Sequence, residues 1–272
     1  MTTQAEQAER FLQLHRPGAP LLMANAWDAG SAKLLASLGF EALATTSGGF
    51  AATLGRLDGS VTRDEALDHA RVLAGAVDVP VSGDLENGFA ADPAGVAETA
   101  KLAVGTGLAG FSVEDYTGRP EDPIYDIDQA ADRVAAAAEV AHRGPARLVL
   151  TGRAENHLHG RNDLADTITR LQRYQEAGAD VLFAPRVNDA GDLRTLLASV
   201  DRPVSVLALP GCPPVAELAA LGVARISVGG SFAMAGFGAV VEAARELREE
   251  GTYGWWDRAI PGGAAVRAAF GA

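Results

Sequence analysis

Two carboxylates, Asp84 and Glu86, follow a short uncharged run that begins at Val79. The run is typical of a strand buried on both faces, and Asn87-Gly88 marks its end. Side chains two residues apart on a strand point to the same side, so both acids would face one pocket. Such a pair suits Mg2+, which takes few protein ligands and keeps several waters. The alternative interpretation is an exposed acidic strand end.

Further carboxylates follow other apolar segments. Glu114 and Asp115 come directly after residues 110–113, and Asp58 lies in a glycine-punctuated loop before the expected helix cap Thr62. Several carboxylates at one mouth repel each other unless a cation offsets their charge. We therefore expect a divalent cation at this end of the strands, and Glu114 could reach it through a water.

Arg153 ends another expected strand, beside Glu155. A guanidinium held among acids favours a bidentate clamp on a substrate carboxylate, and an internal salt bridge with Glu155 is the alternative. The small residues Ser47, Gly48 and Gly49 could receive a carboxylate or an oxyanion through their backbone amides. A tight turn explains the same three residues.

Other residues at strand ends leave their roles open. Trp27 could form a wall of the pocket or pack against its neighbours. His157 and His159 lie in a polar loop, which is more typical of solvated histidines than of metal ligands. Cys212 fits a buried small residue better than a nucleophile. Residues 229–231, Gly-Gly-Ser, resemble a phosphate-binding turn but lack partners of their own.

The elements that must position these residues alternate along the chain. Glycine recurs where expected helices give way to strands, in a role typical of a left-handed helix stop. The pattern favours one eight-stranded parallel (β/α)8 barrel, or TIM barrel, over residues 1–272, with 250–272 as a C-terminal packing arm. An open doubly wound sheet is the alternative. The expected strands are 21–27, 42–47, 79–86, 110–115, 147–154, 180–185, 203–209 and 225–229, and the expected helices are 3–14, 30–38, 62–76, 92–106, 127–142, 162–177, 189–199, 213–221 and 231–249.

Composition narrows the class of protein. The 272 residues carry a net charge of -12 and no basic run, which argues against a nucleic-acid surface. Cys212 is the only cysteine, so an intrachain disulfide and a cysteine-based zinc site are excluded. No apolar run is long enough for a transmembrane helix, and the polar N-terminus lacks a signal-peptide core. We expect a soluble, cytoplasmic protein.

The order of several phrases carries a family resemblance. N-A-W-D-A-G-S-A, T-T-S-G-G, L-G-R-L-D-G, S-G-D-L-E-N-G-F, V-E-D and G-R-A-E-N follow one another over residues 25–156. In this order they resemble the isocitrate lyase and phosphoenolpyruvate mutase superfamily. The resemblance implies a (β/α)8 barrel whose last helix is swapped in a homodimer or homotetramer. It also implies Mg2+, with Mn2+ as an alternative, and a small-molecule 2-oxo acid or its enolate.

The resemblance also implies roles for individual residues. Asp84 matches the direct metal ligand, and Asp58, Glu86 and Glu114 match acids that hold the metal's waters. Arg153 matches the cation that binds the substrate carboxylate. Trp27 matches an aromatic residue near the substrate, and Ser47, Gly48 and Gly49 match the backbone cradle for the 2-oxo acid. Asp58, Glu114 and Arg153 are thus the catalytic candidates, and Asp84, Glu86 and Glu114 the metal-binding candidates.

The chain departs from the family in the segment after Asp115. Residues 116–125 have the length and polarity of a mobile lid, but they lack the K-K-C-G-H phrase of the lyases and the Lys and Asn-Ser of the phosphorus-carbon enzymes. The first hypothesis is a Mg2+-dependent carbon-carbon lyase or decarboxylase that forms an enolate. The alternatives are a phosphorus-carbon mutase or hydrolase on phosphonopyruvate, and a catalytically silent protein that binds 2-oxoglutarate or oxaloacetate.

Overall fold

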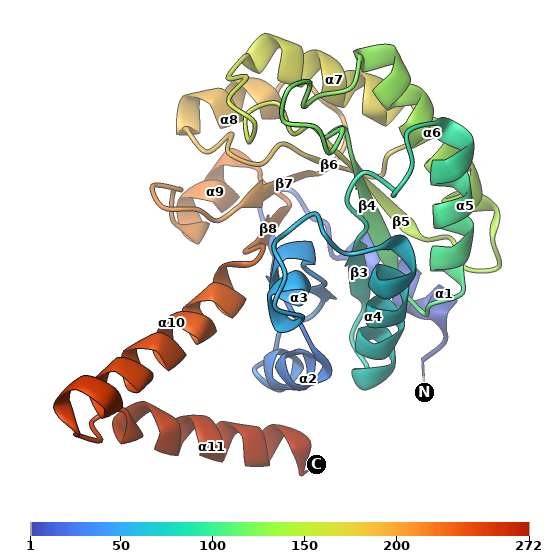
Figure 1. Cartoon of the computed structure of the whole chain (residues 1–272). Helices are drawn as coiled ribbons and strands as arrows, with labels where there is room; N and C mark the ends of the chain where they lie inside the picture. Colours follow the sequence, from blue (N-terminus) through green and yellow to red (C-terminus); the bar gives the residue numbers. More distant parts are fainter. Residues whose placement is uncertain (1, 272) are drawn as a thin grey trace.

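Eight parallel strands close into a barrel in the computed structural model, which describes residues 2–271 (Figure 1). Each strand pairs with the next in chain order, and β8 pairs with β1. The predicted (β/α)8 barrel is therefore confirmed, and the open sheet is excluded. The strands are β1 (Leu21–Asn25), β2 (Leu43–Ala44), β3 (Val81–Asp84), β4 (Gly110–Glu114), β5 (Val149–Arg153), β6 (Val181–Phe183), β7 (Val204–Leu207) and β8 (Arg225–Ser227).

Helices connect the strands and surround most of the barrel (Figure 1). They are α1 (Gln4–Gln13), α2 (Ala29–Ser37), α3 (Ser47–Thr53), α4 (Arg63–Ala76), α5 (Pro93–Val104), α6 (Ile127–Arg143), α7 (Leu164–Glu176), α8 (Ala190–Leu197), α9 (Val215–Leu221), α10 (Ser231–Arg245) and α11 (Trp256–Phe270), with a π-helical turn at Glu246–Glu250. No helix within residues 2–271 is both long and apolar enough to cross a membrane.

Local sequence signals explain where the helices begin and end. Thr62 caps α4 in a reciprocal capping box with Glu65, and Asp92 caps α5 directly before Pro93. At the helix-to-strand joint after α7, Gly178 has a φ of 106°, a left-handed conformation that glycine adopts without steric cost. The expected glycine stop is confirmed at this joint.

Two helices have no counterpart among the helix ranges expected from the sequence. Residues Ser47 to Thr53 form α3 instead of a tight turn, because Thr46 caps this short run of small residues. The C-terminal packing arm contains α11, and Figure 1 shows α10 leading away from the barrel before α11 returns beside α2. Only Ala233 of α10 is buried in the chain described here.

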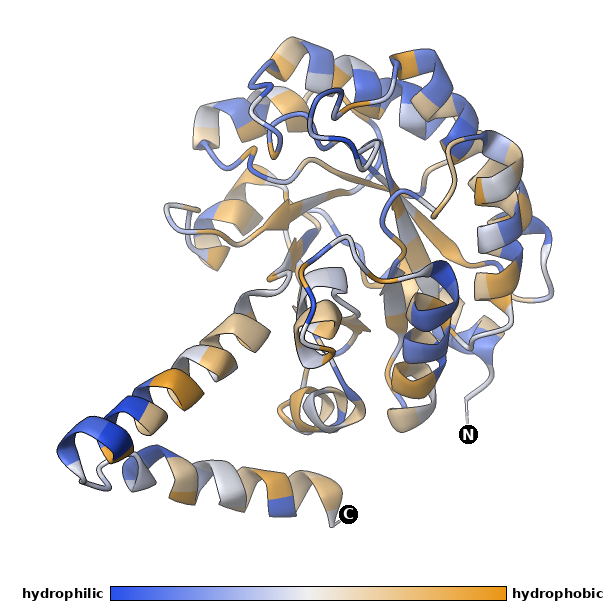
Figure 2. Cartoon of the chain, in the orientation of Figure 1, coloured by the Kyte–Doolittle hydropathy of each residue, from blue (hydrophilic) through white to orange (hydrophobic). Residues whose placement is uncertain are grey.

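The hydrophobic core lies mainly between the barrel and its surrounding helices. Figure 2 shows apolar residues along the strands and on the inward sides of the helices, and also along the projecting α10 and α11. On α10, Phe237 and Val240 are 41% and 65% exposed. Leu22 of β1 is 43% exposed, although strand residues of a barrel are ordinarily covered by helices. The apolar surface of α10 and α11 is thus left largely uncovered within one chain.

Candidate active site

A cavity of about 500 Å³ lies among the residues at the carboxyl ends of the strands. This is the end of a parallel barrel at which enzymes carry their chemistry. The residues that line it include five of those expected from the sequence, namely Ser47, Gly48, Asp58, Asp84 and Arg153, whereas Glu86 and Glu114 lie outside this lining. The barrel thus brings together residues that lie far apart in the chain.

Asp84, the last residue of β3, is fixed from two sides. Its Oδ2 accepts a hydrogen bond from the Ser47 amide at 3.0 Å, and its Oδ1 lies 3.0 Å from Arg153 Nη1. Its own amide donates to Thr45 Oγ1 at 2.7 Å. These contacts hold the carboxylate at the cavity wall in one orientation.

Arg153 joins three carboxylates at the end of β5. Its Nη1 lies 3.0 Å from Asp84 Oδ1, and its Nη2 lies 3.2 Å from Glu114 Oε2 and 3.0 Å from Glu155 Oε1. Burial opposes the charged form, but the three carboxylates prevail and raise the pKa of Arg153 above its usual range. The salt bridge with Glu155 is therefore present, and the guanidinium still lines the cavity.

Glu86 and Glu114 hold their protons more tightly than ordinary glutamates do. Burial, followed by the charges of Asp84 and Asp58, raises the pKa of Glu86 to about 7. Burial also raises the pKa of Glu114 well above its usual range, although Arg153 opposes the shift. Glu86 has a φ of 47°, and its buried Oε1 has no hydrogen-bond partner. A bound cation would favour the ionised form of both carboxyls and would offset the charges of Asp84 and Asp58 beside them.

These oxygen ligands fit Mg2+ held mostly through water. Among residues 2–271, no three acidic, histidine or cysteine side chains lie close enough together to bind one ion directly. A cation here would contact one or two carboxylates and keep several waters, which is the coordination that Mg2+ prefers. The partnerless oxygen of Glu86 is available to accept a hydrogen bond from such a water.

Neighbouring side chains pack closely against the two glycines of α3, so these glycines do not form an open binding surface. A Cβ atom on Gly48 would lie 3.1 Å from Asp58 Oδ2. A Cβ atom on Gly49 would lie 2.5 Å from Thr46 Cγ2 and 3.1 Å from Trp27 Cβ. Gly49 and Trp27 are not among the residues that line the cavity, so their contact with a substrate stays a prediction.

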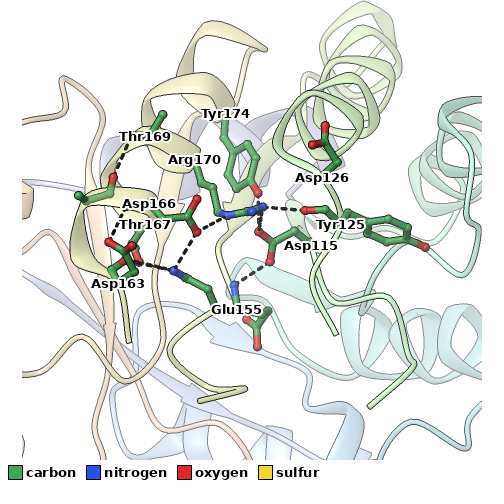
Figure 3. A network of polar contacts seen from close by, with 12 residues as sticks. Asp115, Tyr125, Asp126, Glu155, Asp163, Asp166, Thr167, Thr169, Arg170 and Tyr174 are labelled. Atoms are coloured by element: carbon green, nitrogen blue, oxygen red, sulfur yellow. Dashed lines mark hydrogen bonds and ion pairs between the residues drawn. The ribbon is translucent and has the colours of Figure 1, made fainter. Parts of the chain in front are cut away.

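Asp115 belongs to a buried network of polar contacts (Figure 3) and does not line the cavity. Its Oδ2 accepts hydrogen bonds from Tyr174 Oη at 2.6 Å and from Arg170 Nη1 at 3.2 Å. Its Oδ1 accepts from the Glu155 amide at 2.7 Å, and Arg170 also donates to the Tyr125 carbonyl at 2.9 Å. Asp115 therefore positions the backbone of Glu155, the acid that holds Arg153.

The segment 116–125 is anchored at both of its ends. Tyr116 pairs with Ile124 in an antiparallel bridge and stacks on His159 with ring centroids 3.9 Å apart. No residue of this segment, all of which the structure describes, lines the cavity. His157 and Cys212 also lie outside the cavity lining. A proton donor on residues 116–125 is thus not identified by the geometry.

The sequence interpretation missed the deeper wall of the cavity. Ser82, Ser112 and Ser227 line it together with Arg225. The signal was present, because Ser82 and Ser112 each lie two residues before an acid that ends its strand, Asp84 or Glu114, and point to the same side as that acid. Arg225 stood inside an expected strand without any recognised motif.

Comparisons with known proteins find relatives that share this fold. A family model for phosphoenolpyruvate phosphomutase matches residues 11–248. A crystal structure from Burkholderia cenocepacia J2315, described as a lyase or mutase, has a TM-score of 0.95 and 48% sequence identity and covers 99% of this chain and 98% of its own. The 2-methylisocitrate lyase of Escherichia coli is 28% identical over 264 residues, 89% of this chain and 88% of its own. Phosphonopyruvate hydrolase, solved with oxalate and Mg2+, shares the fold with a TM-score of 0.84 at 22% identity, over 99% of this chain and 95% of its own.

Proposed function

The chain belongs to the phosphoenolpyruvate phosphomutase family, in the isocitrate lyase and phosphoenolpyruvate mutase superfamily, and from this premise we propose a specific activity for it. The protein is a Mg2+-dependent lyase that acts on a small 2-oxo acid or 2-hydroxy acid derivative. It breaks a carbon-carbon bond, or decarboxylates its substrate, through an enolate. The observation that carries the proposal is the convergence of Asp84 and Glu114 on Arg153 at the cavity, with Glu86 adding its charge beside them.

The proposal assigns a role to each side chain. Arg153 binds the substrate carboxylate, exchanging some of its contacts with Asp84 and Glu114 for the new anion. Glu155 is 1% exposed and keeps the guanidinium oriented toward the cavity. Asp84, Glu86 and Glu114 would hold Mg2+, directly or through water, and Asp58 would hold a water from across the cavity. When bound, Mg2+ supplies the positive charge that stabilises an enolate oxygen.

Two alternatives remain because residues 116–125 place no identified proton donor at the cavity. The first is phosphorus-carbon chemistry on phosphonopyruvate, which the structural likeness to phosphonopyruvate hydrolase supports at the level of the fold. The second is a protein that binds 2-oxoglutarate or oxaloacetate without turnover. Both alternatives use the same Mg2+-binding and carboxylate-binding groups as the lyase. The first would break a phosphorus-carbon bond, and the second would break no bond.

Turnover of 2-methylisocitrate, oxaloacetate and phosphonopyruvate, each measured with Mg2+ and with EDTA, separates the three functions. The lyase predicts chelator-sensitive loss of one of the first two acids, restored by Mg2+ or Mn2+. Asp84→Ala should abolish this turnover, and Asp68→Ala, on the exposed face of α4, should not. Turnover that survives EDTA, or that survives Asp84→Ala in a folded protein, would exclude a metal-dependent lyase. Cleavage of phosphonopyruvate alone would favour phosphorus-carbon chemistry. Mg2+-dependent binding of a 2-oxo acid without turnover would favour the binding protein.

We further propose that the protein is a homodimer or homotetramer in which α10 and α11 pack on a second copy. The apolar side chains of α10 are exposed within one chain, and so is Leu22 on the barrel wall. A second copy of the same arm would cover both surfaces. Light scattering should give a multiple of the 28.0 kDa chain mass, and Val240→Glu should shift it toward the monomer. A monomeric wild-type protein would contradict the proposal that α10 and α11 pack on a second copy.

A further inference from the structure

The interior of the barrel below the acids is unusually polar. Parallel barrels ordinarily fill this space with bulky branched side chains. Here Ser82 and Ser112 lie one layer below Asp84 and Glu114, and both line the cavity together with Ser227. The cavity therefore continues inward from the site of the acids as a space lined by hydroxyl groups.

Arg225 forms part of the deep end of this cavity. It is 3% exposed, and its guanidinium contacts neutral groups. Nε donates to Ser205 Oγ at 2.9 Å, Nη1 and Nη2 lie 3.2 and 3.3 Å from Thr151 Oγ1, and Nη1 lies 3.2 Å from His15 Nε2. Burial, and then the charge of Arg225, lowers the pKa of His15 to about 3, so this histidine is neutral.

The charge of Arg225 is not balanced by a neighbouring acid. Burial, followed by the charge of Arg153, lowers the pKa of Arg225 to about 9, so it stays cationic at neutral pH. Within residues 2–271 no carboxylate lies within ion-pairing distance of its guanidinium. A buried charge is costly when it is left unpaired, and an anion entering the cavity would offset that cost.

The strand register places Arg225 well below Arg153. Arg153 pairs with Phe183, Phe183 with Ser205, and Ser205 with Arg225 across three successive strand pairs. Arg153 ends β5, whereas Arg225 begins β8, so the row descends into the barrel. Three steps of about 4.8 Å at a tilt of about 36° lower the backbone by roughly 8 Å.

From this arrangement we infer a second anion-binding subsite at the floor of the cavity, formed by Arg225 with Ser82, Ser112 and Ser227. It binds the distal acidic group of a substrate whose 2-oxo acid end is held at Arg153. The subsite would therefore select acids that carry two anionic groups separated by a few carbon atoms over acids that carry one. This inference rests on the proposed function, because it assumes that the 2-oxo acid end binds at Arg153.

Binding of pyruvate and of oxaloacetate, compared by calorimetry with Mg2+ present, tests the subsite, because the two acids share a 2-oxo acid end and differ in the distal carboxylate. If the protein turns oxaloacetate over, the KM of oxaloacetate and the competitive inhibition constant of pyruvate are compared instead of calorimetric affinities. Arg225→Gln should weaken oxaloacetate by roughly 10- to 100-fold and leave pyruvate unchanged, as expected for loss of a charge-assisted hydrogen bond. Arg225→Lys should recover part of the difference. Arg147→Gln, which removes a cation paired with Asp180 outside the cavity, is the matched control and should change neither affinity.

The outcomes distinguish the subsite from the proposed function. If a folded Arg225→Gln variant binds both acids equally more weakly, or binds both with unchanged affinity, the subsite is overturned. Mg2+-dependent binding of pyruvate would in that case still uphold the 2-oxo acid site at Arg153. Absence of Mg2+-dependent binding of both acids to the wild-type protein overturns the proposed function and the subsite with it. Circular dichroism and urea unfolding of each variant identify a loss of folding. If Arg225→Gln fails to fold, Arg225→Lys and Ser112→Val are measured in its place. A preference for oxaloacetate over pyruvate that is unaltered in both variants overturns the subsite.

Discussion

Replacing Glu86 with glutamine should stabilise the metal-free protein at alkaline pH. Burial and the charges of Asp84 and Asp58 raise the pKa of Glu86 from 4.5 to about 7. The folded state therefore binds this proton more tightly than the unfolded state. The stability that this carboxyl contributes is fully present below pH 4.5 and is lost as pH rises through 7. The shift corresponds to at most about 3.5 kcal/mol, since one pKa unit is about 1.4 kcal/mol, and partial exposure of the side chain reduces it.

Urea unfolding of wild-type protein and Glu86→Gln in EDTA measures the effect. At pH 8 the variant should be more stable by about 1–3 kcal/mol. Well below pH 4.5 the two proteins should converge, because the carboxyl is then protonated in the unfolded state as well as in the folded state. Mg2+ at pH 8 should stabilise the wild-type protein more than the variant, since a cation favours the ionised carboxylate. Glu98→Gln, on the exposed face of α5, is the matched control and should show neither effect. A variant that is less stable than the wild-type protein at pH 8, or a difference that does not depend on pH, would refute the reasoning.

Three further substitutions test the scaffold around the site, each by urea unfolding. Tyr174→Phe removes a 2.6 Å hydrogen bond to the buried Asp115 and should cost about 1–3 kcal/mol; a loss below about 0.5 kcal/mol would contradict its structural role. Gly49→Ala places a methyl group 2.5 Å from Thr46 Cγ2 and should cost about 1–3 kcal/mol, whereas a neutral effect would show that α3 can shift. Burial lowers the pKa of His15 to about 3, so between pH 6.5 and 3 the unfolded state binds the extra proton and stability falls as pH falls. His15→Gln should reduce that slope by about 1.4 kcal/mol per pH unit, and an unchanged slope would mean that His15 is protonated in the folded protein.

The repeating order of strands and helices was predictable from the sequence, because local signals encode it. Apolar runs, helix caps such as Thr62 and glycine stops such as Gly178 act over a few residues, so the chain itself carries them. The shared orientation of Asp84 and Glu86 was expected from strand alternation, but the backbone turns at Glu86, where φ is 47°. Their proximity to Arg153 followed from the barrel, in which every strand ends at the same face.

The partners of each charged group could not be predicted from the sequence. Arg153 contacts Asp84, Glu114 and Glu155 at once, and Asp115 turns away to Tyr174, although the chain presents Glu114 and Asp115 as neighbours. These choices depend on strand register and on side-chain packing between residues far apart in the chain. Arg225 shows the same limit, because its place beneath Arg153 arises from the register of four strands and the tilt of the closed barrel. Local sequence sets which face a side chain occupies, whereas the closed sheet sets which charges meet there and how much water they lose, and these determine their pKa values and their chemistry.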